Sequence, residues 1–190
     1  CATADVYDSS DNNYHGKSCP ITTGQTTPVT GKLNNAINLN GTDNYIDLGT
    51  SLDQNGDISL SAWVKTDNIA SGVRSIVSNY SATCAAGDYS LDINTTAAKV
   101  TLNWANTDVI TSTTSLTTTA WYHIVAVRYG TTGAWNAKIY INGILDKTAS
   151  TAQNPDGSSV GTSIGRAGAC AGGYFDGTID DVRIYNYALT

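Results

Sequence analysis

The chain has 190 residues, enough for one domain or at most two small ones, and enough to bury a core without metals or cystines. Only 14% of residues are charged, all 16 acidic residues are Asp, and Glu and Met are absent, so strong helix formers are scarce and a mostly helical protein is not expected. The net charge of −6 argues against nucleic acid or an anionic membrane as partner, and no apolar run is long enough to cross a bilayer.

Short strand patterns separated by turns recur along the chain after a loop region at residues 1–30. Strands are predicted at 36–39, 45–48, 59–65, 74–78, 89–93, 99–104, 121–129, 138–141, 144–145, 163–166 and 178–185. No linker or internal repeat interrupts the series. Strands at this spacing predict a single all-β domain over 1–190, built as an antiparallel sandwich or jelly roll.

Three of these segments carry more detail. In 59–65, Trp63 and Lys65 point away from the apolar set that includes Leu60 and Val64. Both faces of 121–129 are apolar, so this strand is expected between two layers. Asn142-Gly143 is a dipeptide typical of a two-residue type I′ hairpin.

Six blocks of sequence carry a family resemblance. They lie at residues 8–16, 39–46, 59–65, 121–127, 140–143 and 175–186. In this order they resemble the laminin-G-like members of the concanavalin A-like lectin/glucanase superfamily. The resemblance implies a jelly-roll β-sandwich of that type. The family's first strand is expected to be short or absent, because only residues 1–6 precede Asp8.

The residues do not favour catalysis. Hydrolases of the superfamily use a Glu-rich strand, and Asp180 and Asp181 are neighbours on one strand whose side chains should point to opposite faces. The two histidines are the available bases for a serine or cysteine nucleophile, and His123 in an apolar strand suits a structural role better. We therefore predict a protein that is not an enzyme.

Calcium is the stronger chemical hypothesis. Asp8, Asp11 and Asn13 alternate in one loop and supply the oxygen ligands that Ca²⁺ prefers. The resemblance suggests that Asp180 and Asp181 approach this loop from the last strand. The alternative is a cluster of Asx turns that bonds only to its own backbone.

Aromatic residues suggest a ligand surface, because sugars stack on rings that can also hydrogen-bond. Trp135, in the polar stretch 130–136, is predicted to be the most exposed ring, and Trp104 the second. Asn103 and Asn106 beside Trp104 would bind hydroxyl groups. Trp63 and Trp121 match family core blocks and are expected to pack inside. An exposed Trp would equally suit a protein partner.

Four cysteines without metal-binding spacing fit two disulfides in an oxidising compartment, with free thiols in a cytosolic protein as the alternative. We predict the pairs Cys1–Cys19 and Cys84–Cys170.

N-glycosylation sequons begin at Asn40, Asn79 and Asn94.

Together these features predict an extracellular or cell-surface module that binds a glycan or a cell-surface protein and is stabilised by Ca²⁺. The alternative is a structural subunit of a surface fibre or pilus-like filament, which would self-assemble through an open sheet edge.

Overall fold

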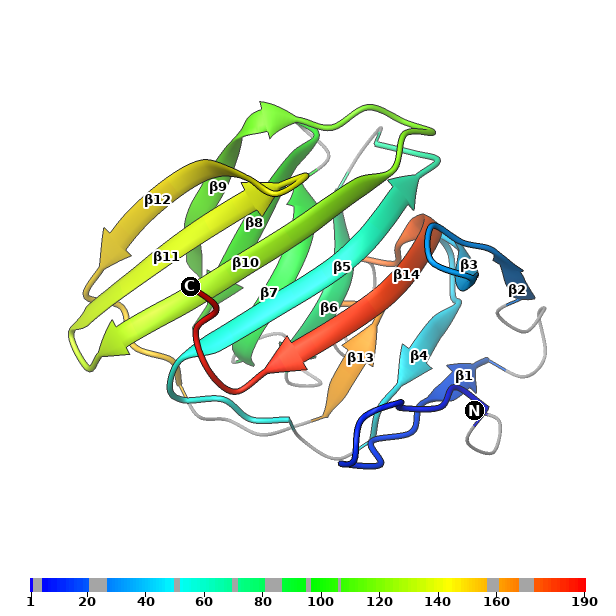
Figure 1. Ribbon diagram of the computed structural model, residues 1–190, viewed down its shortest axis with the longest axis horizontal. Helices are drawn as coiled ribbons and strands as arrows, with labels where there is room; N and C mark the ends of the chain where they lie inside the picture. The colour runs from blue at the N-terminus through cyan, green and yellow to red at the C-terminus, as the bar shows by residue number, and fades with distance from the viewer. Residues whose placement is uncertain are drawn as a thin grey trace.

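The computed structural model describes residues 1, 5–20, 27–49, 52–69, 72–80, 87–94, 97–105, 107–156, 161–167 and 173–190. These residues form strands and turns but no helix, as the composition predicts. No segment among them is therefore a helix that could span a bilayer. Two seven-stranded antiparallel sheets pack face to face (Figure 1), which confirms the predicted sandwich.

The sheet nearer the viewer in Figure 1, the front sheet, has the order β12-β11-β10-β5-β14-β3-β2. Its strands are β2 (Thr27–Thr30), β3 (Asn35–Asn40), β5 (Ile58–Thr66), β10 (Tyr122–Thr131), β11 (Ala134–Ile141), β12 (Ile144–Thr151) and β14 (Asp176–Tyr185). Three of its adjacent strand pairs are not consecutive in the chain, namely β10-β5, β5-β14 and β14-β3. Because β5 lies between β10 and β14, the last strand pairs with a strand from the first half of the chain.

The other sheet, the back sheet, has the order β1-β4-β13-β6-β7-β8-β9. Its strands are β1 (Lys17–Cys19), β4 (Tyr45–Asp47), β6 (Val73–Tyr80), β7 (Gly87–Asn94), β8 (Lys99–Trp104), β9 (Thr107–Ser115) and β13 (Thr162–Ile164). All predicted strands are present. The sequence analysis did not predict β1, β2 and β9. These strands are short or rich in Ser and Thr and show weak apolar alternation.

The core lies between the two sheets and follows the alternation of the strands. In β5, Leu60 and Val64 are fully buried between the sheets, whereas Trp63 and Lys65 are half-buried on the outer side. In β10, Ile124 points into the same core, and His123 lies on the outer side. The expectation that β10 lies between two layers is wrong, because only one of its faces packs against the other sheet.

The hairpin between β11 and β12 turns at Asn142 and Gly143, as predicted. Their φ angles are +53° and +78°. Positive φ at both positions defines the type I′ turn, which only Gly and a few residues such as Asn adopt at low cost.

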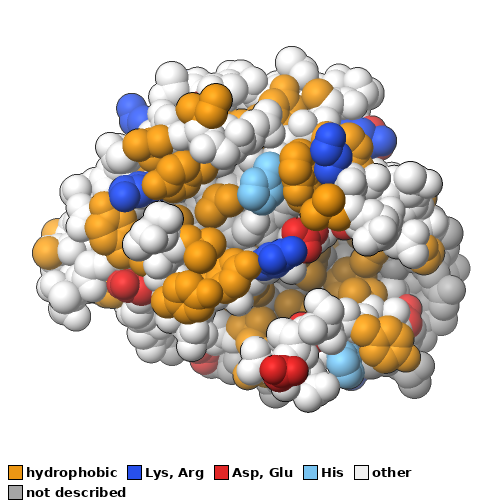
Figure 2. Space-filling view, in the orientation of Figure 1, with side chains coloured by type: hydrophobic (Ala, Val, Ile, Leu, Met, Phe, Trp, Pro, Cys, Tyr) orange, Lys and Arg blue, Asp and Glu red, His pale blue; other side chains and the backbone are white. Residues whose placement is uncertain are grey.

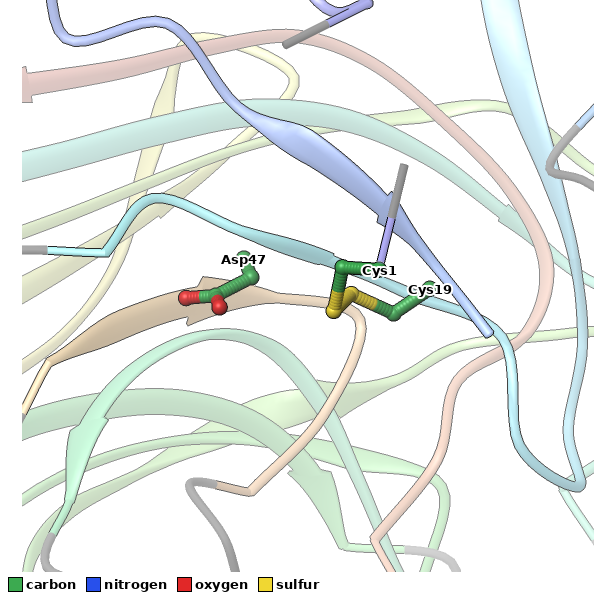
Figure 3. A group of neighbouring side chains, drawn as sticks. All are labelled: Cys1, Cys19 and Asp47. Carbon is green, nitrogen blue, oxygen red and sulfur yellow. A yellow bond between two sulfur atoms is a disulfide. The ribbon is translucent and has the colours of Figure 1, made fainter. Parts of the chain in front are cut away.

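A disulfide joins Cys1 to Cys19 and closes the N-terminal loop, which confirms that pairing (Figure 3). Val6 also forms an antiparallel bridge with Gly16, just before β1. A closed loop of this length stabilises the fold by about 3 kcal/mol in the chain-entropy account. Cys84 and Cys170 lie outside the described residues.

Candidate functional site

The loop that contains Asp8 is held by its own hydrogen bonds. One Asp8 carboxylate oxygen accepts a bond from the Ser10 amide (2.9 Å), and the other accepts bonds from the Ser10 hydroxyl (2.7 Å) and the Tyr14 amide (3.0 Å). Partial burial acts to raise the pKa of Asp8, but these bonds outweigh it and hold the pKa below its usual value. Asp11 and Asn13 are exposed, and the Asn13 amide donates to the Asp11 carbonyl oxygen. The arrangement is an Asx-turn cluster.

The two aspartates of β14 have other partners. Asp180 is buried, and one of its oxygens accepts bonds from the amides of Lys32 (2.8 Å) and Leu33 (2.7 Å). Asp181 forms an ion pair with Arg183 (3.0 Å). A bulge in β14 between Asp180 and Arg183 allows these two neighbouring aspartates to have different partners.

The expected convergence of Asp8 with Asp180 or Asp181 is therefore wrong. Within the described part of the chain, the one group of three metal-ligating types whose ligand atoms lie close together is Cys1, Cys19 and Asp47 (Figure 3). Both sulfurs of this group are joined in the disulfide, so neither is a thiolate ligand. The five predicted ligands do not fit one ion, and calcium binding by the Asp8 loop alone stays a prediction.

The predicted exposed rings are buried. Trp135 is only 5% exposed and Trp104 is fully buried, so neither forms the expected ligand surface. The Trp104 indole N–H donates to the Gln153 carbonyl (2.9 Å), and that of Trp135 donates to the Asn154 side chain (3.0 Å).

The buried cation Arg128 explains why these two rings lie inside. Its guanidinium lies 5.4 Å from the Trp104 ring centre and 5.5 Å from that of Trp135. It also donates to the carbonyls of Gly56 and Gln54. A buried charge needs such partners, and here aromatic faces and backbone carbonyls provide several of them.

The amide residues beside Trp104 do not form the expected site either. The Asn103 side chain donates to Asp108 (2.9 Å), and Asn106 lies outside the described residues.

The tryptophans that were expected in the core, Trp63 and Trp121, are the half-exposed ones. They lie on the outer surface of the front sheet, which we call the front face. Its residues are Lys32, Trp63, Lys65, Trp121, His123, Tyr129, Lys138, Arg183 and Tyr185. Figure 2 shows hydrophobic, basic and histidine side chains gathered on this side of the molecule. The correction follows from alternation, because residues that flank inward-facing Leu60, Ala62 and Val64 must face outward.

Trp63 is at the centre of the front face. It lies opposite His123 in the register of β5 and β10, with ring centres 5.0 Å apart and planes inclined by 31°. The ammonium group of Lys32 lies 5.1 Å from the centre of the indole ring. The amides of Lys32 and Leu33 donate hydrogen bonds to Asp180, and these bonds hold Lys32 in its place beside Trp63.

His123 is a neutral, positioned ring. Its Nε2 lies 3.0 Å from the Ser61 hydroxyl. Burial lowers its pKa and the charge of Arg183 acts in the same direction, while Asp181 opposes them. Within the described residues no carboxylate hydrogen-bonds to the other ring nitrogen, so the pair lacks the third group that activates a serine.

Two further cations cover rings on this face. The Lys65 ammonium lies 5.6 Å from the Trp121 ring centre, and the Lys138 ammonium lies 5.1 Å from that of Tyr129. Tyr185 contacts Tyr187 at the C-terminal end of β14, with ring centres 5.4 Å apart. The front face therefore presents several half-buried rings, each beside a polar or charged group.

Two other features lie away from the front face. A surface hollow of about 350 Å³ lies at the end of the β11–β12 pair, lined by residues 133–136 and 150–152. In the back sheet, Asp92 is buried and accepts a hydrogen bond from Ser90 (2.5 Å), while its second oxygen has no partner among the described residues. Neither feature offers an exposed ring.

The three sequons differ in accessibility. Asn79 is fully buried and donates to Thr162 (3.1 Å), so a glycan at this position is incompatible with the fold. Asn40 is exposed, but its side chain caps the turn at 41–44. Asn94 is half-buried at the end of β7.

Comparisons with known proteins agree with this architecture. A family model described as the concanavalin A-like lectin/glucanases superfamily matches residues 40–190, and the chain belongs to this laminin-G-like family. Comparison with curated protein sequences found no matching relative.

Several solved structures share the fold at low sequence identity. Domain 4 of AbnA, an extracellular arabinanase from Geobacillus stearothermophilus solved with arabinotriose, is 22% identical, with a TM-score of 0.65 over 88% of this chain and 78% of that chain. A Bacteroides ovatus protein proposed to bind carbohydrate is 19% identical, with a TM-score of 0.57 over 72% of this chain and 39% of that one. A heptameric pentraxin from Limulus polyphemus is 18% identical, with a TM-score of 0.54 over 74% and 70%. At these identities the likeness establishes the fold alone.

Proposed function

We propose that this chain is a non-catalytic glycan-binding module that binds sugars on the front face. The observation that carries the proposal is the half-buried Trp63 indole, with His123 beside it and Lys32 above it. Sugars offer apolar C–H faces that stack on such rings, while their hydroxyl groups need polar neighbours. The arabinanase domain solved with arabinotriose gives independent support for a sugar ligand.

The proposal includes an extracellular or cell-surface location. The disulfide between Cys1 and Cys19 supports it, because disulfides persist in oxidising compartments. The absence of Glu from the sequence and the engagement of Asp180 in a structural turn support a module without hydrolytic activity.

Self-assembly through an open edge stays a prediction. The edge in question is β1, and the amide and carbonyl of Gly16 beside it already bond to Val6. The Ser18 amide of β1 donates to the Asp5 side chain (2.8 Å). An incoming strand would need these groups, so the structure favours the binding module.

The direct test is a glycan array probed with wild type and Trp63→Ala. We expect wild type to bind a set of glycans and Trp63→Ala to lose at least tenfold in affinity, because removal of one stacking ring costs about 1–3 kcal/mol when bases stack on proteins and a similar loss is expected for sugars. Tyr14→Ala, at an exposed ring in the Asp8 loop, is the matched control and should bind normally. Melting curves of both variants check that they fold. Binding by Trp63→Ala equal to that of wild type would contradict the proposal.

A further inference from the structure

The front face differs in charge from the rest of the molecule. The chain has 16 acidic residues against 10 basic ones and a net charge of −6. Four of the ten basic residues, Lys32, Lys65, Lys138 and Arg183, nevertheless lie on this one face. A local excess of positive charge on an acidic protein directs anionic ligands to one face, because this face attracts anions and the remaining surface repels them.

Among the described residues, three of these cations form no ion pair. In the described part of the chain, the one ion pair joins Arg183 to Asp181. The ammonium groups of Lys32, Lys65 and Lys138 instead lie within 5.1–5.6 Å of the centres of aromatic rings. A cation–π contact at an exposed site is weak, so an anionic ligand can bind each ammonium group at small cost.

The cation–ring pairs also follow a line. His123 and Tyr129 share the outer side of β10 because side chains alternate along a strand, and Trp121 immediately precedes this strand. Trp63 lies opposite His123 in the register of β5 and β10. The contact between Lys32 and Trp63 therefore lies next to the contact between Lys65 and Trp121. Eight residues separate Trp121 from Tyr129, which at about 3.3 Å per residue is roughly 26 Å. Such a row fits an extended polymer better than a single sugar.

We propose that the front face binds carboxylate-bearing polysaccharides, that is, chains of uronic acids. A uronic acid unit offers a C–H face to an indole ring and a carboxylate to the ammonium group above it. The three ring–ammonium pairs would then bind anionic units spaced along the polymer. This inference rests on the proposed function, since it names the class of glycan for the same surface.

The experiment compares oligogalacturonates with their fully methyl-esterified forms, which have the same backbone without the charge. Wild type is expected to bind the acid form at least tenfold more tightly at low salt. The preference should shrink as NaCl screens the charges, and affinity should rise with chain length. In the double variant Lys32→Met and Lys65→Met, which keeps most of the apolar side chain, the preference should fall to near unity. Lys17→Met, at an exposed position of β1 in the other sheet, is the control and should keep it.

The outcomes separate the two proposals. Equal binding of acid and ester forms by wild type, or a preference that survives in the double variant, would overturn the assignment of uronic acids and leave a neutral glycan module. If Trp63→Ala binds every glycan as tightly as wild type does, the front face itself is not the binding surface and both proposals fail.

Discussion

At the scale of single residues, the back sheet contains an ionisable group that the fold does not fully satisfy. Asp92 is 6% exposed, and one of its carboxylate oxygens has no hydrogen-bond partner among the described residues. Burial raises the pKa of Asp92 to about 6 and the charge of Asp108 acts in the same direction, while the hydroxyl groups of Ser90 and of Ser75, opposite Asp92 in the register of β6 and β7, act to lower it. At neutral pH the protein therefore holds a buried carboxylate under strain from desolvation.

This pKa makes stability depend on pH. Because the pKa of Asp92 in the folded chain lies above the ordinary value of 3.8, the native state binds more protons than the unfolded state between roughly pH 4 and pH 6. The contribution of Asp92 to the free energy of unfolding is thus greatest below pH 4. It falls by up to roughly 3 kcal/mol as the pH rises through 6. Asp92→Asn should remove this loss and be more stable than wild type at pH 7.5. Denaturant unfolding at pH 5 and pH 7.5 measures it.

The control for this prediction is Asp67→Asn, at an exposed position after β5. It should leave the pH dependence of wild type unchanged. An Asp92→Asn protein whose free energy of unfolding falls between pH 5 and pH 7.5 as steeply as that of wild type would contradict the role given to Asp92.

At the scale of elements, the bulge in β14 determines how this strand packs against β5 and against the turn between β2 and β3. The register of β14 against β5 shifts between Asp180 and Arg183, and Asp181 adopts a φ of +48°. The bulge directs Asp180 to the turn between β2 and β3, where a Cβ atom on Gly31 would lie only 2.4 Å from the Asp180 carboxylate. Gly31 is therefore required for the approach of this carboxylate to the turn.

The two adjacent aspartates should consequently differ in their contribution to stability. Asp180→Ala removes the buried carboxylate that accepts bonds from the amides of Lys32 and Leu33 and should lower the free energy of unfolding by about 2–3 kcal/mol. Asp181→Asn keeps a residue type that tolerates the positive φ of this position, removes only a partly exposed ion pair and should cost less than about 1 kcal/mol. Urea titrations of the two variants provide the comparison, and equal losses would show that the Asp180 bonds do not hold the turn.

The strands could be predicted from sequence because their apolar alternation is strong. In β5 this alternation places Trp63 and Lys65 on the outer side, although the match to family core blocks predicted that Trp63 packs inside. The positions of Trp104 and Trp135 could not be predicted from sequence. Their burial depends on Arg128, which belongs to another strand, and local sequence patterns do not reveal such a partner. The expected convergence of Asp8 with Asp180 could not be judged from sequence for a similar reason, whereas calcium binding by the Asp8 loop stays a prediction. Proximity of Asp8 to Asp180 is a property of the complete topology.

At the scale of the whole molecule, the two sheets have different tasks. The back sheet supports the core, and its strand β1 is tied to the N-terminus by the disulfide and by the bridge from Val6. The front sheet also contributes half the core, but its outer face keeps aromatic rings and cations at the surface (Figure 2). A rigid sheet is a suitable support for such a face, because a ligand that binds preformed rings causes little loss of conformational entropy.

The four tryptophans provide the most direct test of the front face as the binding surface. Each gives one indole N–H signal in a ¹⁵N-correlated NMR spectrum, and two lie on the front face while two are buried around Arg128. On titration with a glycan that wild type binds, the signals of Trp63 and Trp121 should shift with the saturation of binding, while those of Trp104 and Trp135 stay in place. Shifts confined to Trp104 and Trp135, or saturable binding that moves neither Trp63 nor Trp121, would contradict the account.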